Sequence, residues 1–294
     1  MQLLKKITEH SGSIYALAHD PNSDLLFTGG ADKIVASWDL NTFKNTPFSI
    51  KTKSAVLNLN VINEQHLFIG LFNGDFHIID LQNKQELKYF TFHKKGVFAS
   101  AYSKEFNRLL VGSGDGNLSI WDTKTYTLLH SDKISEGKII TIEIINSLAY
   151  IGTSEGYVLV IEINTLQQIA SYKINEEGIN TLCFLKQKNA LLIGGKKASL
   201  FVFSLSKNET ILEIPAHNWP IYKILNLESK GLFTCSRDKT IKQWNPENLE
   251  LIKRYCFPEF KGHTHSINNL IYISSKKLLI SAGDDKSWCA WKPN

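Results

Sequence analysis

Short apolar segments, each followed by a tight polar turn, recur along the whole chain. Within them β-branched and aromatic residues alternate with polar ones, as in residues 240–244, and long stretches with helical periodicity are absent. Each copy contains a strand, a turn rich in Gly, Asp, Asn or Lys, a second strand, and an aromatic or aliphatic residue before a polar one. The pattern predicts small antiparallel β-sheets.

Seven copies align, and they occupy residues 25–39, 66–80, 108–122, 148–162, 190–204, 231–245 and 277–292. The residue before the final polar position marks each copy: Trp38, Ile79, Trp121, Ile161, Phe203, Trp244 and Trp291. Successive markers are 41, 42, 40, 42, 41 and 47 residues apart, which is room for four short strands per copy. Such a sheet cannot bury both of its faces alone, so the copies are expected to stack radially into a closed ring.

These repeats resemble the WD-repeat β-propeller family over essentially the whole chain. The resemblance is carried by Trp38-Asp39, Trp121-Asp122, Gly262-His263 and the turns at residues 112–116 and 236–239. It implies an all-β fold, a seven-bladed β-propeller of four-stranded antiparallel blades, in a single domain over residues 1–294. It also implies that residues 1–8 supply the outer strand of the last blade and close the ring, because no fourth strand fits after Trp291.

The resemblance further implies buried hydrogen-bond networks in the repeats whose marker is a Trp. Each joins a His before the first strand, a Ser or Thr in the second, an Asp in the tight turn and the Trp in the third. The complete sets are His10, Thr28, Asp32 and Trp38; His217, Thr234, Asp238 and Trp244; and His263, Ser281, Asp285 and Trp291. A fourth set, His93, Asp115 and Trp121, has Val111 where the hydroxyl is expected. The other three repeats are expected to rely on apolar packing.

A His, a hydroxyl and an Asp also describe the triad of a hydrolase. Here similar trios recur, and each includes a Trp whose indole N–H needs an acceptor, whereas an enzyme needs one nucleophile beside an open pocket. We therefore interpret the networks as structural and predict neither catalytic residues nor enzymatic activity. The glycines at residues 29–30, 112–116 and 194–195 do not precede helices, which argues against a phosphate loop, and we attribute them to turn dihedral angles.

Composition narrows the class further. Hydrophobic residues make up 43 % and charged residues 21 % of the chain, which indicates a globular protein, and the net charge of +5 is too small to predict nucleic-acid binding. Four cysteines, Cys183, Cys235, Cys256 and Cys289, form no C-x-x-C pair and are expected as reduced thiols in strands. No spacing indicates a metal site or a cofactor. Without a signal peptide or a long apolar run, the protein is expected to be soluble, cytoplasmic and not associated with membranes.

The resemblance implies that partners bind the top face of the propeller, through residues early in each first strand and residues just before the turn Asp. By register the first set is Tyr15, Leu57, Phe98, Thr141, Asn180, Tyr222 and Asn268, and the second is Ala31, Phe72, Gly114, Ser154, Lys196, Arg237 and Asp284. With the adjoining loop, the partner-binding candidates are Tyr15, Phe72, Phe98, Lys196, Trp219, Tyr222 and Arg237. Aromatic and cationic side chains are typical of binding hot spots, although these aromatics also suit half-buried sheet positions.

Extra residues around positions 255–260 predict a longer loop with exposed aromatics on the same face. The leading interpretation is a non-catalytic scaffold that binds a peptide or protein, as a monomer or in a hetero-complex. The alternative is a binder of an anionic ligand or nucleic acid through Lys196, Lys197, Arg237 and Trp219, which predicts a steep loss of affinity with salt.

Overall fold

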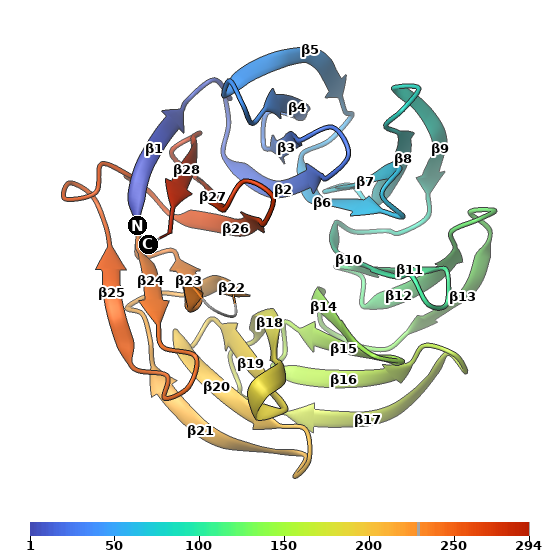
Figure 1. Ribbon diagram of the computed structural model, residues 1–294. Coiled ribbons are helices and arrows are strands. Elements are labelled where there is room, and N and C mark those ends of the chain that lie inside the picture. The colour runs from blue at the N-terminus through green and yellow to red at the C-terminus, as the bar shows by residue number, and fades with distance from the viewer. Residues whose placement is uncertain (228–229, 294) are drawn as a thin grey trace. The chain divides into compact units, whose positions relative to one another are not determined.

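The computed structural model describes residues 1–227 and 230–293, and its regular structure there is made up of strands and short 3-10 turns such as η1 (Lys186–Lys188). The strands of this described part form seven sheets of four strands each, and every sheet except one takes four consecutive strands (Figure 1). The fold class expected from the sequence, an all-β β-propeller with seven four-stranded antiparallel blades, is confirmed.

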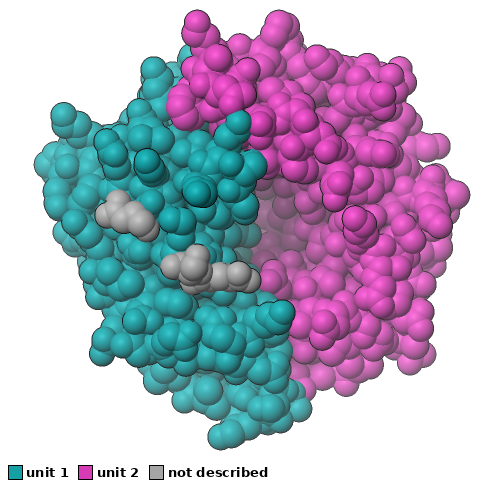
Figure 2. All heavy atoms as spheres, viewed as in Figure 1, with its two compact units in different colours: residues 1–15, 180–294 teal, residues 16–179 magenta. Residues whose placement is uncertain are grey.

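Two compact units divide the chain (Figure 2): unit 1 contains residues 1–15 and 180–294, and unit 2 contains residues 16–179. The boundaries fall in the first strands of two sheets. The assignment of the whole chain to a single domain stays a prediction.

Four sheets lie mainly in unit 2, with strands joined in chain order. The first contains β2 (Ile14–Asp20), β3 (Leu25–Gly30), β4 (Ile34–Asp39) and β5 (Lys44–Lys51). The second contains β6 (Val56–Ile62), β7 (His66–Leu71), β8 (Asp75–Asp80) and β9 (Gln85–Thr91). The third contains β10 (Val97–Ser103), β11 (Arg108–Ser113), β12 (Asn117–Asp122) and β13 (Leu128–Lys133). The fourth contains β14 (Ile139–Ile145), β15 (Leu148–Thr153), β16 (Tyr157–Glu162) and β17 (Gln167–Lys173).

Three sheets lie mainly in unit 1. One contains β18 (Ile179–Leu185), β19 (Ala190–Gly195), β20 (Ser199–Ser204) and β21 (Glu209–Pro215). The next contains β22 (Ile221–Asn226), β23 (Leu232–Ser236), β24 (Ile241–Trp244) and β25 (Leu251–Tyr255). The last contains β26 (Ile267–Ile273), β27 (Leu278–Gly283), β28 (Trp288–Lys292) and β1 (Gln2–Ile7).

The N-terminal strand completes the last of these sheets. β1 runs antiparallel to β28, with Gln2 opposite Lys292 and Ile7 opposite Trp288. Lys6 Nζ adds a bond of 2.9 Å to the Asp285 carboxylate, which anchors the strand at its end. The expected pairing of residues 1–8 with the strand that carries Trp291 is therefore confirmed, over residues 2–7.

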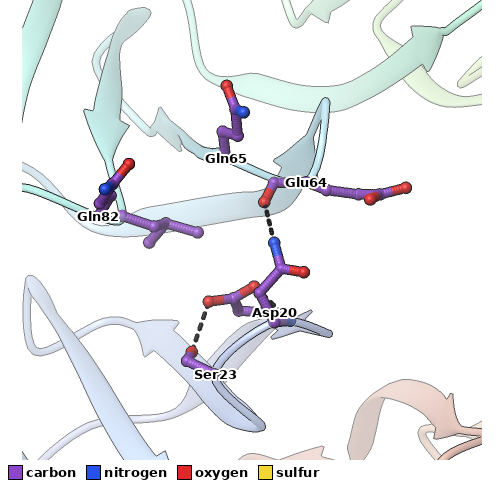
Figure 3. A pocket seen from close by; sticks show the side chains of 7 residues that line it. Asp20, Ser23, Glu64, Gln65 and Gln82 are labelled. Atoms are coloured by element: carbon purple, nitrogen blue, oxygen red, sulfur yellow. Dashed lines mark hydrogen bonds between the residues drawn. The ribbon is translucent and has the colours of Figure 1, made fainter.

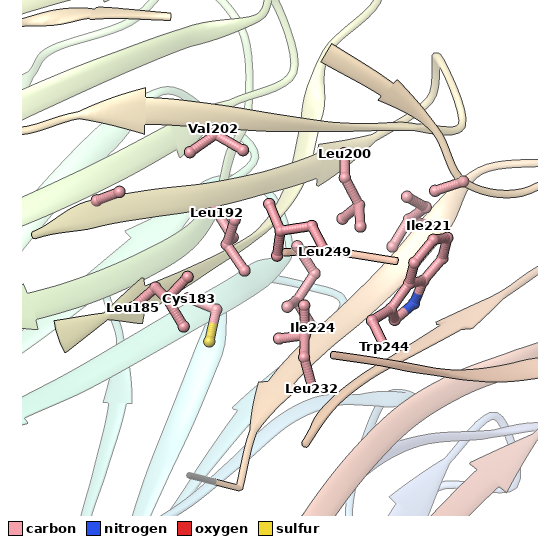
Figure 4. Close-up of a cluster of buried hydrophobic side chains, with 12 residues drawn as sticks. Cys183, Leu185, Leu192, Leu200, Val202, Ile221, Ile224, Leu232, Trp244 and Leu249 are labelled. Carbon is pink, nitrogen blue, oxygen red and sulfur yellow. The ribbon is translucent and has the colours of Figure 1, made fainter. Parts of the chain in front are cut away.

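Burial explains the apolar runs of the second and third strands. Every residue of β19 and β20 is buried, because both faces of the sheet pack against neighbouring structure, whereas β21 is exposed along almost its whole length. Figure 4 shows the resulting core, in which Leu192 and Val202 of one sheet meet Ile224 and Trp244 of the next. Truncating a buried Leu in such a core to Ala costs about 2–5 kcal/mol.

Close approach between consecutive sheets accounts for glycines that we had attributed to turns. Gly29, Gly112 and Gly194 lie inside strands, and a Cβ on Gly112 would stand 2.3 Å from the Ile139 side chain of the next sheet. The turn interpretation is wrong for these three, because the missing Cβ makes room for a β-branched neighbour. It holds for Gly116, whose φ of +82° needs a glycine in the turn after β11.

Candidate interaction site

A hydrogen-bonded network organises the turns of the β22–β25 sheet. His217 Nε2 lies 2.7 Å from Thr234 Oγ1, the Trp244 indole donates to the same oxygen at 2.9 Å, and His217 Nδ1 lies 2.8 Å from Asp238 Oδ2. With the proton on Nδ1, the imidazole donates to the carboxylate and accepts from the hydroxyl, so each of these atoms is satisfied. Thr234 is fully buried, and its oxygen has no access to a substrate.

Asp238 ties the turn to the loop that precedes the sheet. Its carboxylate accepts from the backbone N–H of Asn218 at 3.2 Å and from the Thr240 hydroxyl at 2.6 Å. Burial alone raises the pKa of Asp238, but the hydrogen bonds from His217 and its neighbours outweigh it and lower this pKa to about 2. Burial lowers the pKa of His217, which favours the neutral imidazole.

The last sheet of unit 1 repeats this arrangement. His263 bonds Asp285 and Ser281, both at 2.8 Å, and the Trp291 indole donates to Ser281 at 2.8 Å. Lys6 adds a cation to the carboxylate, and the pKa of Asp285 is lowered because its hydrogen bonds outweigh the effect of burial.

In the β10–β13 sheet the network hydroxyl comes from the third strand, β12, and not from the second strand, β11. Ser119 lies across from Val111 in the β11–β12 pair, and its oxygen lies 2.9 Å from His93 Nε2 while accepting the Trp121 N–H at 2.8 Å. Asp115 Oδ2 lies 3.5 Å from His93 Nδ1. The expectation that this repeat lacks a hydroxyl is therefore wrong. A serine two residues before the Trp marker is the sequence signal that reveals it.

In the first sheet the Trp38 indole donates to Thr28 Oγ1 at 2.8 Å, and Asp32 accepts from the backbone of Ile34 in the turn at 3.3 Å. His10 is buried just before β2. In the described chain the same pairing of an indole with a buried hydroxyl thus recurs in all four sheets whose marker is Trp.

Three candidate binding residues meet in unit 1, and we call Trp219, Tyr222 and Arg237 the Trp219 patch. The Arg237 guanidinium lies 5.2 Å from the centre of the Trp219 ring, and the Trp is 54 % exposed. The Ser236 hydroxyl donates to the Trp219 carbonyl at 2.9 Å, and the Arg237 N–H donates to the Pro220 carbonyl at 3.0 Å. These bonds hold the loop and the turn together, so the pair is presented on a rigid support.

Tyr222 is half-buried in β22 beside this pair. Burial raises the pKa of its hydroxyl, and the charges of Arg237 and Asp284 act on it in opposite directions. The patch therefore offers an exposed indole, a guanidinium and a partly covered phenol on one surface of unit 1.

The other candidates are spread along the chain. Phe72 and Phe98 belong to unit 2, where Phe72 is 61 % exposed and Phe98 is half-buried, with Lys138 Nζ 5.4 Å from its ring centre. Tyr15 is half-buried in β2 and belongs to unit 1. Lys196 is exposed in the turn after β19.

Lys197, which the alternative function requires, is engaged within its own sheet. Its ammonium lies 2.9 Å from Glu213 on β21 and 5.4 Å from the centre of the Phe201 ring. The hydrogen bond from Lys197 is the largest cause of the lowered pKa of Glu213. The anionic-ligand set therefore has one of its three cations already paired.

Two residues that the register places on the binding face also bond a neighbouring strand. The amides of Asn180 and Asn268 donate to the carbonyls of Ile221 and Ile14, at 2.9 and 3.0 Å, and so join one first strand to the next. A bulge in β14 places Thr141 opposite Gly152. The equivalent bulge in β10 lies at Phe98, so Ile140, not Thr141, occupies the register of Phe98, and the predicted position is wrong by one residue.

The extra residues around 255–260 expose one aromatic side chain rather than several. Tyr255 is buried at the end of β25 and donates to Gln243 at 2.8 Å, and Phe260 packs edge-on against it at 4.9 Å. Phe257 is 54 % exposed. Cys256 follows β25, so the expectation of a strand position holds only for Cys183, Cys235 and Cys289, which lie in β18, β23 and β28.

A hollow of about 320 Å³ in unit 2 lies beside the turns after β2 and β6 (Figure 3). Its polar groups bond one another: Asp20 accepts from the Ser23 hydroxyl and the Asn22 N–H, and the Asn22 amide donates to the Glu64 carbonyl at 2.6 Å. Among the described residues no group of three His, Cys, Asp or Glu is arranged to hold a metal ion, and no helix has the length and apolarity needed to cross a bilayer.

Comparison with known proteins identifies the family. The family model described as "WD domain, G-beta repeat" matches residues 1–39, 84–122, 208–245 and 254–292, which together are more than half of the chain. The chain belongs to the WD-repeat family. The matched segments contain the four Trp-marked copies of the WD repeat, and the copies marked by Ile79, Ile161 and Phe203 fall outside them.

Three curated proteins illustrate the similarity, and each matches part of this chain. "WD repeat-containing protein 55" of Arabidopsis thaliana is 21 % identical over 83 % of this chain and 71 % of its own length. "Shk1 kinase-binding protein 15" of Schizosaccharomyces pombe is 30 % identical over 48 % of this chain and 41 % of its own length. "Protein LST8 homolog" of Dictyostelium discoideum is 26 % identical over 57 % of this chain and 58 % of its own length. WD-repeat propellers generally act as scaffolds for protein interactions.

Proposed function

We propose that this WD-repeat protein is a non-catalytic scaffold that binds a peptide or protein partner through the Trp219 patch. The observation that supports it is the exposed Trp219 ring under the Arg237 guanidinium, held by a turn that the Asp238 network makes rigid. Tyr, Trp and Arg are the residues most enriched at binding hot spots, because large rigid groups bury much area at little cost in conformational entropy. A cytoplasmic location remains part of the proposal.

The catalytic interpretation has little support in this geometry. The hydroxyls of Thr234 and Ser281 are fully buried and hydrogen-bonded on both sides, so neither is placed to attack a substrate. A relative whose name describes binding to a kinase is consistent with a protein partner for this chain.

The test begins with affinity capture on wild-type protein and identification of the captured proteins by mass spectrometry. Each candidate is then purified, and its affinity is measured by titration against wild type, W219A, R237A and Y157A. Tyr157 is the matched control, because it is an exposed aromatic with Lys173 Nζ 4.5 Å from its ring centre in another sheet.

We expect W219A to weaken binding by about 2 kcal/mol, roughly 30-fold, and Y157A to leave it unchanged. A partner that binds W219A and R237A as tightly as wild type would refute the patch. Raising salt from low to physiological concentration should change the affinity little, whereas a loss of several orders of magnitude would favour the anionic-ligand alternative.

A further inference from the structure

A second hollow, of about 290 Å³, opens in unit 1 beside the turn that carries Arg237. It lies between that turn, the end of β25 and the segment that leads to β26. Its lining is Asp238, Lys239, Thr240, Arg254, Cys256, Phe257, His263 and Thr264. We call it the Arg254 pocket.

The two buried ionisable groups in this lining are already used. Asp238 is bonded to His217 and to Thr240, and His263 is bonded to Asp285 and Ser281. Neither is left over for a ligand. The charges that remain in the pocket are therefore those of its exposed cations.

Those cations, Lys239 and Arg254, are both exposed, and neither forms an ion pair within residues 1–227 and 230–293. Lys242 lies nearby: its pKa is lowered mainly by burial, and the positive charge of Arg254 lowers it further. Lys242 donates to the Ala216 carbonyl at 2.6 Å, so its ammonium is engaged outside the lining of the pocket. The lining thus holds two exposed cations and one carboxylate, Asp238, which His217 and Thr240 already engage.

One wall of the Arg254 pocket is apolar. Phe257 is 54 % exposed there, and Cys256 beside it is half-buried. A ligand that fits both the cations and this wall carries an anionic group on a short apolar stem. An Asp or Glu side chain of a peptide has that form, and its carboxylate accepts the charge-assisted hydrogen bonds that Arg and Lys donate.

We propose that the Arg254 pocket binds an acidic side chain of the partner peptide, next to the segment held by the Trp219 patch. This proposal rests on the proposed function. Arg237 of the Trp219 patch and Lys239 of the Arg254 pocket flank Asp238 in one turn, so the same turn carries a residue of each site. The Trp219 patch supplies contact area, and the Arg254 pocket selects peptides that carry a carboxylate.

The experiment uses a random 12-residue peptide library displayed on phage and selected on the full chain. The best peptide and a copy with its acidic residue changed to the amide are synthesised with a fluorescent label. Their affinities are measured by polarisation for wild type, K239Q, R254Q, W219A and K286Q. Lys286 is the matched control, since it follows Asp285 in the turn of the last sheet with a φ of +60°, as Lys239 follows Asp238 with a φ of +68°.

We expect the selected peptides to be enriched in Asp or Glu. K239Q and R254Q should each lower the affinity for the acidic peptide about tenfold. The amide peptide should bind wild type about tenfold more weakly and lose little further affinity in K239Q or R254Q. K286Q should bind both peptides as wild type does.

Equal losses for both peptides in R254Q, or no loss at all, would overturn the Arg254 pocket. If W219A then still weakens both peptides, the proposed function survives without the pocket. If the peptides bind W219A as tightly as wild type but bind R254Q more weakly, the Trp219 patch is overturned and the Arg254 pocket is supported. A library that yields no binding peptide counts against both.

Discussion

The sheets β18–β21 and β22–β25 are neighbours in unit 1 and share one register, yet they stabilise their turns by different means. Thr234, Asp238 and Trp244 in the second correspond to Ile193, Lys197 and Phe203 in the first. The former residues form a buried network, while Ile193 and Phe203 pack in an apolar core and Lys197 reaches out to Glu213.

This difference explains why the Trp219 patch lies where it does. The Asp238 carboxylate binds both the turn and the Asn218 backbone, so Trp219 and Arg237 are held relative to one another. The turn after β19 has a lysine at that place, and its exposed Lys196 has no comparable support. Polar networks therefore do more than satisfy buried atoms: they fix the geometry of the loops next to them.

The largest expected effect comes from comparing conservative substitutions at matched positions of the two sheets, one of which removes a buried hydroxyl. T234V leaves the Trp244 N–H and His217 Nε2 without a partner, and should lower the free energy of unfolding by about 3 kcal/mol. I193V, at the same register, removes only a methyl group and should cost about 1 kcal/mol. Denaturant unfolding of both variants measures the difference, and equal costs would show that the network adds no stability.

A second test moves the hydroxyl back to its usual strand in the β10–β13 sheet. S119A should cost about 2 kcal/mol, because the Trp121 N–H and His93 Nε2 lose their acceptor and donor. The double variant V111T/S119A should recover most of the loss, since the introduced hydroxyl would stand directly across the strand pair from position 119. Failure of the double variant to recover stability in thermal unfolding would contradict this account of the relocated hydroxyl.

The pH dependence of stability gives a third, smaller contrast. Burial lowers the pKa of His217 in the folded state, so below the unfolded value of 6.5 the unfolded chain binds the proton first. The free energy of unfolding should therefore decrease as the pH is lowered below 6.5, and this group contributes up to about 1.4 kcal/mol per pH unit. The Asp238 contribution is lost only lower, between 3.8 and about 2.

Urea unfolding between pH 7.5 and 5 tests this assignment. H217Q should be less stable at pH 7.5 and show a smaller contribution to the decline. The remaining slope is the sum of groups such as His93, whose pKa burial also lowers, and His263, whose pKa is raised to about 9 and which acts in the opposite direction. An unchanged slope in H217Q would mean that the folded protein binds the proton at this site as readily as the unfolded chain does.

The smallest expected effect is at Lys197. K197A removes an exposed ion pair and should change the free energy of unfolding by less than about 0.5 kcal/mol. D238A, at the same register in the next sheet, removes a buried acceptor of several bonds and should cost several times more. Similar values for the two would erase the distinction between the sheets.

Register and periodicity were enough to predict the strands and the seven copies, and the resemblance to the WD-repeat family implied the His–hydroxyl–Asp–Trp networks. They were not enough for Ser119, because a hydroxyl can enter a buried site from either of two paired strands. They also misplaced Thr141, because two residues join β14 to β15 where four join β10 to β11, which shifts the count from the marker. Neither a cross-strand partner nor the exact length of a turn is visible in the linear pattern.

By itself the sequence determined the fold class, because alternation of side chains along short strands and a repeat near 41 residues leave few ways to bury apolar surface. Only the tertiary structure decided which of the aromatic residues are exposed. Tyr255 and Phe257 look alike in the chain, yet one is buried under Phe260 and the other is exposed beside Arg254. Exposure depends on what a neighbouring sheet or loop covers, and that is a property of contacts between residues far apart in the chain.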